Sequence, residues 1–198
     1  SVATLHFAGI DRLGRPFVVL EWIEGEPITT WCDARQLGLR DRAALLAQAC
    51  DAVQHAHLRG IVHCDLKPAN ILVTERDGTP LVKVIDFGLT RSRDGSAAML
   101  GNPVLGTPGY MAPEQMEAAE DIDARSDIWA LGVTLYRLLT DRFPYEPAGD
   151  WGWHPKSFEK PPRPPSAFNP DCDARLDAIV AKCIEIPLHR RYQSAAEL

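Results

Sequence analysis

The chain contains 198 residues, the length of one ordinary domain and enough to bury a hydrophobic core. Hydrophobic residues make up 45% and charged residues 24% of it, a composition typical of globular proteins rather than disordered ones. The net charge of −6 gives no reason to expect affinity for nucleic acid or an anionic membrane surface. No signal peptide and no run of about 18 apolar residues is visible, so we expect no membrane segment in this stretch.

The cysteines indicate a reducing compartment. There are five, which is an odd number, and none forms a Cys-x-x-Cys pair or a Cys/His cluster. Cys50 and Cys183 fall on the apolar faces of predicted helices, where a reduced core thiol is expected. We therefore expect a cytoplasmic protein.

In chain order, the pattern first predicts two strands and two helices. The strands lie on either side of a turn at 11–14, and the second strand, 16–22, is strongly apolar. A short helix is expected over 28–35. A longer helix is expected over 39–59, where apolar residues recur at helical spacing and Gly60 provides a good end.

Two histidines on the second helix raise the possibility of a metal site. His55 and His57 are two positions apart, so their side chains point to different sides of a helix. We expect packing or surface roles for them rather than metal binding. A hairpin turn at 75–78 then leads into a strand over 81–85.

The second half of the chain is predicted to be mainly helical after a small, polar loop over 89–105. Ser126 is a good N-cap for a helix over 127–140 that leaves few polar faces and should be buried. An amphipathic helix is expected around 176–184, and a last helix is expected to begin at Ser194.

Candidate catalytic residues are concentrated in the stretch 61–70, IVHCDLKPAN, which begins as a short apolar strand and continues into a polar loop. Asp65 could accept a proton from a hydroxyl, and Lys67 could neutralise a phosphoryl oxygen. Asn70 could offer its amide oxygen to a hard cation. A second carboxylate, Asp86, ends the next strand before Phe-Gly and could complete a Mg²⁺ site.

These motifs resemble those of protein kinases. HCDLKPAN followed by DFG resembles the catalytic loop and the metal-binding loop. GTPGYMAPE at 106–114 resembles the end of an activation segment, and SDIWALG at 126–132 resembles the start of the central helix of the large lobe. Four motifs in this order are far more specific than one. TWCDARQLGLRDR, AVQHAH and RRYQSAAEL are similar to bacterial serine/threonine kinases that are often joined to other domains.

The resemblance implies an α+β, protein kinase-like fold that consists mainly of the helical large lobe. Residues 1–22 would be the last strands of the small lobe, and 23–198 would be the hinge and a large lobe truncated at its last helix. A Gly-rich loop, a phosphate-anchoring Lys and its partner Glu do not occur before these strands. We therefore expect the missing small lobe upstream, and we expect this chain alone to be inactive and to bind ATP weakly.

The resemblance also implies roles for the candidate residues. Asp65 would orient the substrate hydroxyl and accept its proton, and Lys67 would steady the transferring phosphoryl group. Thr107 would bridge toward both and favour Ser/Thr substrates. Asn70 and Asp86 would hold Mg²⁺.

ATP would meet the hinge as well as these loops. Leu20 would be the gatekeeper, and Leu72 would lie under the adenine ring. The Glu21 carbonyl and the Ile23 N–H would meet the adenine edge. The implied nucleotide-binding residues are Leu20, Glu21, Ile23, Lys67, Asn70, Leu72 and Asp86.

Further residues would support the site. His63 would stack beneath Phe87 rather than carry protons, and Asp127 would receive backbone N–H groups from the catalytic loop. Cys64 stands where most kinases carry an Arg that pairs with a phosphorylated activation loop. Because a thiol cannot form that pair, activity should depend less on loop phosphorylation.

One buried ion pair is also implied. Glu114 would pair with a late arginine, for which Arg191 is the best candidate and Arg190 the alternative. The Asp-Pro that usually precedes this arginine is replaced by Pro-Leu at 187–188.

The implied activity is Mg²⁺-dependent transfer of the ATP γ-phosphoryl group to Ser or Thr hydroxyls of proteins. A small-molecule phosphotransferase of kinase-like fold shares the Asp and Asn pattern but should lack GTPGYMAPE. The other alternative is a non-catalytic pseudokinase or scaffold that only binds partners, against which the intact Asp65, Lys67, Asn70 and Asp86 argue.

Overall fold

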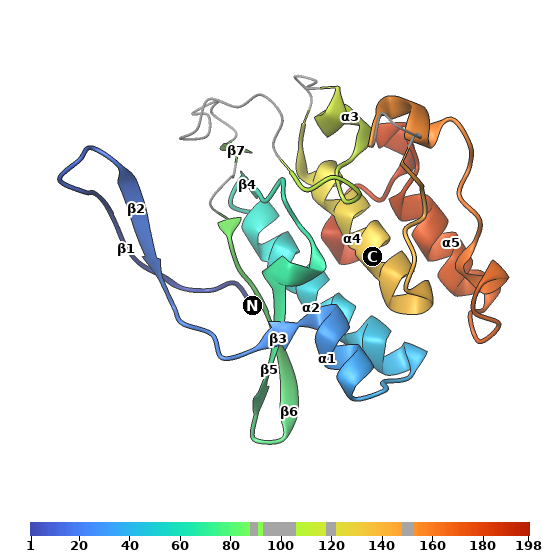
Figure 1. Cartoon of the computed structure of the whole chain (residues 1–198), viewed down its shortest axis with the longest axis horizontal. Helices are drawn as coiled ribbons and strands as arrows, with labels where there is room; N and C mark the ends of the chain where they lie inside the picture. The colour runs from blue at the N-terminus through green and yellow to red at the C-terminus, as the bar shows by residue number, and fades with distance from the viewer. Residues whose placement is uncertain (88–90, 93–105, 118–121, 148–152) are drawn as a thin grey trace.

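A computed structural model of the chain describes residues 1–87, 91–92, 106–117, 122–147 and 153–198. It shows a mainly helical body from which a two-stranded hairpin projects (Figure 1). The mixture of helices and small antiparallel sheets confirms the predicted α+β class. No helix among the described residues is long and apolar enough to cross a membrane.

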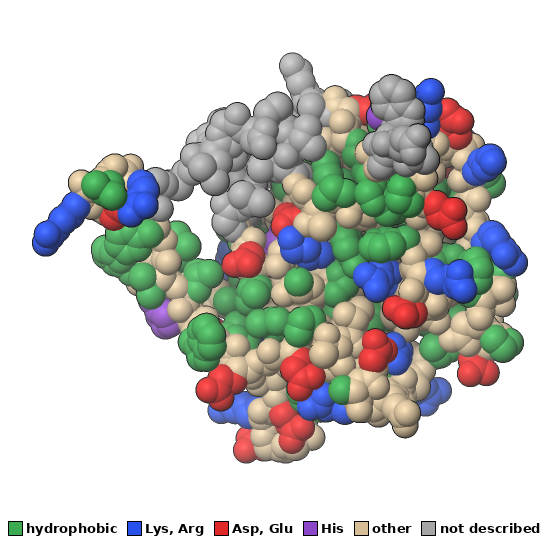
Figure 2. Space-filling view, viewed as in Figure 1, with side chains coloured by type: hydrophobic (Ala, Val, Ile, Leu, Met, Phe, Trp, Pro, Cys, Tyr) green, Lys and Arg blue, Asp and Glu red, His purple; other side chains and the backbone are tan. Residues whose placement is uncertain are grey.

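The projecting hairpin consists of β1 (Leu5–Ile10) and β2 (Pro16–Leu20), which pair in antiparallel register as predicted. Its turn is closed by Asp11, whose carboxylate accepts hydrogen bonds from the backbone N–H groups of Leu13 and Arg15. The hairpin has exposed apolar side chains on its surface, which appear green at the left of Figure 2.

A second sheet joins three strands in the order β3-β5-β6, namely β3 (Glu26–Pro27), β5 (Ile71–Arg76) and β6 (Thr79–Val84). The turn between β5 and β6 consists of Asp77 and Gly78, both with positive φ, as Asp-Gly in a two-residue hairpin loop predicts. Strand β6 begins two residues before the predicted start at 81, because the tight turn allows Thr79 to pair with Arg76.

The helices carry most of the core. Helix α2 ends two residues before the predicted end, because the N–H groups of residues 58–60 turn back to the carbonyls of Gln54, Ala56 and His57. The predicted helices over 28–35, 127–140 and 176–184 are all present with small shifts of their ends. The helices are α1 (Ile28–Ala34), α2 (Leu39–His57), α3 (Pro113–Met116), α4 (Ala124–Thr140) and α5 (Ala174–Cys183).

Helix α4 lies at the centre of the body and is buried on nearly all sides. The prediction that Ser126 caps it is wrong. The helix begins earlier, and the carboxylate of Asp123 accepts the N–H of Arg125 at the cap. Gly132 lets α5 approach closely, because a Cβ atom there would overlap the Cβ of Cys183.

The remaining elements are short. The helix expected from Ser194 is only a 3-10 turn. The expected loop over 89–105 lies outside the described residues except for β7, which pairs with β4. These elements are β4 (Ile61–Val62), β7 (Arg91–Ser92), η1 (Pro68–Asn70), η4 (Pro155–Phe158), η5 (Pro165–Ala167), η6 (Leu188–Arg190) and η7 (Ala195–Glu197).

Candidate active site

Three of the predicted catalytic side chains meet at one point. The Thr107 hydroxyl donates a 2.6 Å hydrogen bond to Asp65 Oδ1. The Lys67 ammonium donates to Asp65 Oδ2 at 2.9 Å and to Thr107 Oγ1 at 2.7 Å. The loop between β4 and η1 supplies Asp65 and Lys67, whereas Thr107 comes from a segment 40 residues after Lys67. The structure therefore closes a carboxylate, an ammonium and a hydroxyl into a triangle.

The predicted metal-binding residues lie beside this triangle. The Asn70 amide donates to the backbone carbonyl of Asp65 at 2.9 Å, which fixes its orientation. The Ile85 N–H donates to the backbone carbonyl of Asn70 at 2.9 Å. This bond places Asp86, the next residue in the chain, near Asn70. Asp86 has φ 59° and an exposed side chain. An amide oxygen and an exposed carboxylate are ligands that suit Mg²⁺.

Asp127 holds the backbone of the catalytic loop, as predicted. It is 1% exposed, and its Oδ1 accepts the Cys64 N–H at 2.9 Å. Its Oδ2 accepts the His63 N–H at 2.8 Å and also lies 2.7 Å from His57 Nε2. Because a carboxylate can only accept, His57 carries a proton on Nε2. The buried carboxylate thus receives three donors.

His57 is the functional residue that the sequence missed. Its side chain is 6% exposed, and its Nδ1 atom has no hydrogen-bond partner among the described residues. The prediction of a packing or surface role did not include a bond to Asp127, which is 70 residues away. Its position at the end of a helix, just before the catalytic loop, was the only local indication.

His63 has the structural role that was predicted. Its ring lies 4.6 Å from that of Phe87, centroid to centroid, with a tilt of 51°. Its Nε2 lies 2.9 Å from the Ile85 carbonyl, and its Nδ1 accepts the Asp65 N–H at 3.2 Å. Both nitrogens are therefore engaged with the backbone, and His63 has no free position for proton transfer.

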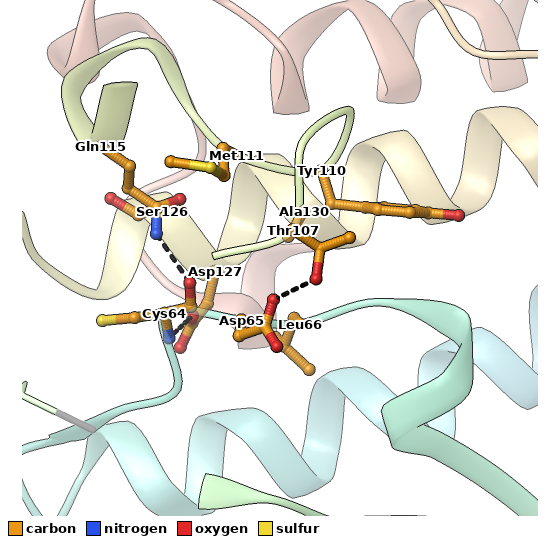
Figure 3. A pocket seen from close by; sticks show the side chains of 10 residues that line it. All are labelled: Cys64, Asp65, Leu66, Thr107, Tyr110, Met111, Gln115, Ser126, Asp127 and Ala130. Carbon is orange, nitrogen blue, oxygen red and sulfur yellow. Dashed lines mark hydrogen bonds between the residues drawn. The ribbon is translucent and has the colours of Figure 1, made fainter. Parts of the chain in front are cut away.

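The catalytic loop, the segment around Thr107 and α4 pack into one junction (Figure 3). The Gln115 amide donates to the Cys64 carbonyl at 2.7 Å, and Cys64 itself has φ 64°. The space among these residues has no room for a water molecule. The junction is therefore a packed contact that positions Asp65 and Thr107 rather than a ligand pocket.

A buried ion pair between Glu114 and Arg191 lies next to this junction, at the start of α4. Arg191 is 1% exposed, and its guanidinium donates to both Glu114 oxygens, at 2.7 and 2.8 Å. Ser126, the predicted helix cap, instead donates its hydroxyl to Glu114 at 2.7 Å. Arg191 is thus confirmed as the partner, and the alternative Arg190 is exposed.

Comparison with known proteins decides the family. The model of the protein kinase domain matches residues 11–197. The chain belongs to the protein kinase family. It is 39% identical over 184 residues to the serine/threonine-protein kinase Pkn1 of Myxococcus xanthus, covering 92% of this chain and 26% of that one. It is 35% identical over 186 residues to PknB of Mycobacterium tuberculosis, covering 92% of this chain and 29% of that one.

The solved structures agree. The crystal structure of the Mycobacterium tuberculosis PknI kinase domain matches with a TM-score of 0.73 and 26% identity, covering 99% of this chain and 68% of that one. The chain spans only between a quarter and a third of the length of the two bacterial serine/threonine kinases above. The predicted membership in the bacterial-type serine/threonine kinases is confirmed.

Only some of the residues predicted to bind ATP lie around one cavity. Leu20 and Asp86 line one cavity of about 340 Å³ together with Phe87. Glu21 and Ile23 stand outside the lining of this cavity, as does Leu72, which lies on β5. The Glu21 carboxylate accepts two 3.0 Å hydrogen bonds from Lys83, which lower the pKa of Glu21. The adenine contacts stay predictions.

Proposed function

We propose that the protein is a serine/threonine protein kinase, which transfers the ATP γ-phosphoryl group to Ser or Thr hydroxyls with Mg²⁺. The observation that carries this proposal is the 2.6 Å hydrogen bond from the Thr107 hydroxyl to Asp65. A β-hydroxyl already sits within hydrogen-bonding distance of the candidate base, in the distance range that proton transfer requires. The names of the bacterial relatives support the same activity.

In this proposal the chain's own residues orient charge rather than form covalent bonds. Asp65 orients the substrate hydroxyl and accepts its proton as the new bond to phosphorus forms. Lys67, which lies 2.9 Å from Asp65, neutralises charge on the transferring oxygens. Thr107, which is hydrogen-bonded to both side chains, holds them in place. Bound Mg·ATP would supply the phosphoryl group, and ADP would leave as the bond between the γ-phosphorus and the bridging oxygen breaks.

Asn70 and Asp86 would hold Mg²⁺ through oxygen atoms. Within the described ranges, no group of three or more His, Cys, Asp or Glu side chains is placed to bind a metal ion. Mg²⁺ is usually bound by one or two protein carboxylates together with nucleotide phosphates, so bound ATP would complete the site that Asn70 and Asp86 begin. The nucleotide would also meet Leu20, Glu21, Ile23 and Leu72 at the hinge.

We also propose that the hairpin β1–β2 forms the end of a small lobe whose other strands lie upstream, with 23–198 as the large lobe. Phe7, Ile10 and Val18 are 58%, 72% and 56% exposed, a surface that the remaining lobe would cover. On this proposal the isolated chain binds Mg·ATP weakly and is inactive. All five cysteines are buried thiols, which supports a reducing, cytoplasmic location.

The test uses the longest natural protein that carries these 198 residues. It is incubated with ATP, Mg²⁺ and three peptides that differ only in a central Ser, Thr or Tyr, and phosphorylation is mapped by mass spectrometry. We expect phosphate on Ser and Thr only, and none after chelation of Mg²⁺ or in Asp86→Asn. Transfer to none of the peptides by a folded protein that binds ATP would contradict the proposal and favour a non-catalytic scaffold.

A further inference from the structure

A groove that contains none of the catalytic triangle residues lies near the C-terminal end of α4. One side consists of residues 142–147, which follow α4, and the other consists of 156–163, drawn in orange ahead of α5 in Figure 1. Tyr136 and Phe168 complete its lining, and its volume is about 700 Å³. This volume is in the range of binding sites in proteins.

The two sides of the groove are preformed. Four prolines line it, and proline fixes the backbone φ and offers no N–H. The Tyr136 hydroxyl donates a 3.0 Å hydrogen bond to the Arg163 carbonyl, which ties one side to the end of α4. A stiff, aromatic- and proline-lined groove suits an extended polypeptide better than a segment that must fold on binding.

The charge of the groove is opposite to that of the chain. Four basic side chains line it against two acidic ones, whereas the whole chain carries −6. The basic residues are all exposed, and none forms an ion pair with a carboxylate in the described part of the chain. They are Arg142, Lys156, Lys160 and Arg163.

Two of the cations are positioned by one ring. The guanidinium carbons of Arg142 and Arg163 lie 4.8 and 4.6 Å from the centroid of Phe168. Two cations that contact the same ring repel each other, and a nearby anion would offset this repulsion. Planar guanidinium groups bind carboxylates through paired hydrogen bonds. Each of these two guanidinium groups, neither of which has an ion-pair partner in the described part of the chain, could therefore bind an acidic side chain.

The groove is connected to the activation segment. Phe143, which lines the groove, packs edge-on against Tyr110 with ring centroids 5.3 Å apart. Tyr110 in turn donates its N–H to the carbonyl of Thr107, the residue bonded to Asp65. Packed side chains and a backbone hydrogen bond therefore link the groove to the segment that positions Asp65.

We propose that this groove binds an extended acidic segment of the protein substrate, remote from the residue that is phosphorylated. This inference rests on the proposed kinase function for the identity of the occupant. Arg142 and Arg163 are specificity-determining residues, and Lys156 and Lys160 strengthen the attraction along the groove.

The first experiment needs no catalysis. Fluorescence anisotropy measures binding of a labelled oligoglutamate peptide, with oligoglutamine of equal length as the control probe. We expect saturable binding of oligoglutamate only, weakened about tenfold or more in the double variant Arg142→Glu, Arg163→Glu. Lys160 contacts no aromatic ring in the described structure. Lys160→Glu should therefore weaken the binding of oligoglutamate, but less than the double variant does. Equal binding of oligoglutamine, or no saturable binding, would overturn the proposal.

Arg175→Glu is the matched control, because Arg175 is an equally exposed arginine outside the groove. It should change the affinity by less than about twofold, and an equal loss in this variant would show non-specific attraction and overturn the proposal.

A second experiment compares KM for a substrate peptide with and without an acidic extension. The groove variants should raise KM only for the extended peptide. Unchanged KM despite lost oligoglutamate binding would overturn the substrate assignment, while absent phosphotransfer with intact binding would instead count against the kinase function.

Discussion

His57 Nε2 donates a 2.7 Å hydrogen bond to Asp127 Oδ2, and both side chains are almost completely buried. Asp127 accepts the backbone N–H groups of His63 and Cys64 with the same carboxylate. The Asp127 carboxylate of helix α4 therefore connects helix α2 and the catalytic loop. The position of Asp65 depends on this arrangement, since Asp65 follows Cys64 directly.

Replacing His57 should disturb both stability and catalysis. His57→Phe leaves the buried Asp127 carboxylate short of one donor, so the free energy of unfolding should fall by about 1–3 kcal/mol. In the kinase, kcat should fall more than KM changes, because Asp65 loses its fixed position. Urea unfolding and steady-state kinetics measure the two effects. His189→Phe is the matched control, because His189 is an exposed histidine that lines none of the cavities described above, and an equal effect there would contradict a role specific to His57.

Removing one partner of the buried ion pair should destabilise the fold strongly. Arg191→Met leaves Glu114 buried with its charge unpaired, so we expect a loss of about 3–5 kcal/mol in the free energy of unfolding. Arg190→Met provides the control, since Arg190 is exposed and should cost less than about 0.5 kcal/mol. Chemical denaturation distinguishes the two, and similar losses in both variants would argue against the assignment.

Gly132 should tolerate no side chain. A Cβ atom there would overlap the Cβ of Cys183, so Gly132→Ala must push α5 away from α4. Overpacking of this kind costs about 1–3 kcal/mol of stability. Gly38→Ala is the control, because a Cβ atom at Gly38 would meet nothing within 4 Å. The contact would be refuted by thermal unfolding that shows no difference between these variants.

The buried thiols should make the protein less stable at alkaline pH. Burial raises the pKa of Cys50 to about 12 and also raises the pKa of Cys183. Between the unfolded pKa of about 8.5 and the folded pKa, only the unfolded state ionises, so stability falls as pH rises by up to about 1.4 kcal/mol per unit and thiol. Unfolding of wild type and Cys50→Ala at several pH values tests this. If the free energy of unfolding fell equally with pH in both proteins above pH ~9, the prediction would be contradicted.

The parts of the site that the sequence predicted are carried by short motifs. Asp65, Lys67 and Asn70 lie within one loop, and Thr107 and Glu114 lie within another. Their chemistry depends on residue type and local spacing, so resemblance could assign them, and the structure confirms the contacts between Asp65, Lys67 and Thr107. The hairpin turn at Asp77 was predicted for the same reason, because its backbone conformation is set locally.

The parts that the sequence missed depend on distant partners. His57 looked like an ordinary helix residue because Asp127 is 70 residues away. Ser126 looked like a helix cap because its real partner, Glu114, belongs to another segment. The groove beside Phe168 unites residues from four separate places in the chain, none of which lies in one of the recognised motifs. A side chain such as that of His57 or Ser126 could have several local roles. Tertiary contacts with distant residues determine which role it has, and these contacts cannot be predicted from the local sequence.

The most direct test of the account is the rate of phosphotransfer to a Ser peptide by the longest natural protein that carries this chain, comparing wild type with Asp65→Asn. Asp51→Asn is the matched control, because Asp51 is an exposed carboxylate on α2. Loss of the general base should lower kcat by about 10²–10⁴ while the control keeps the wild-type rate. A folded Asp65→Asn variant that retains the wild-type rate would contradict the assignment of Asp65, and with it the proposed mechanism.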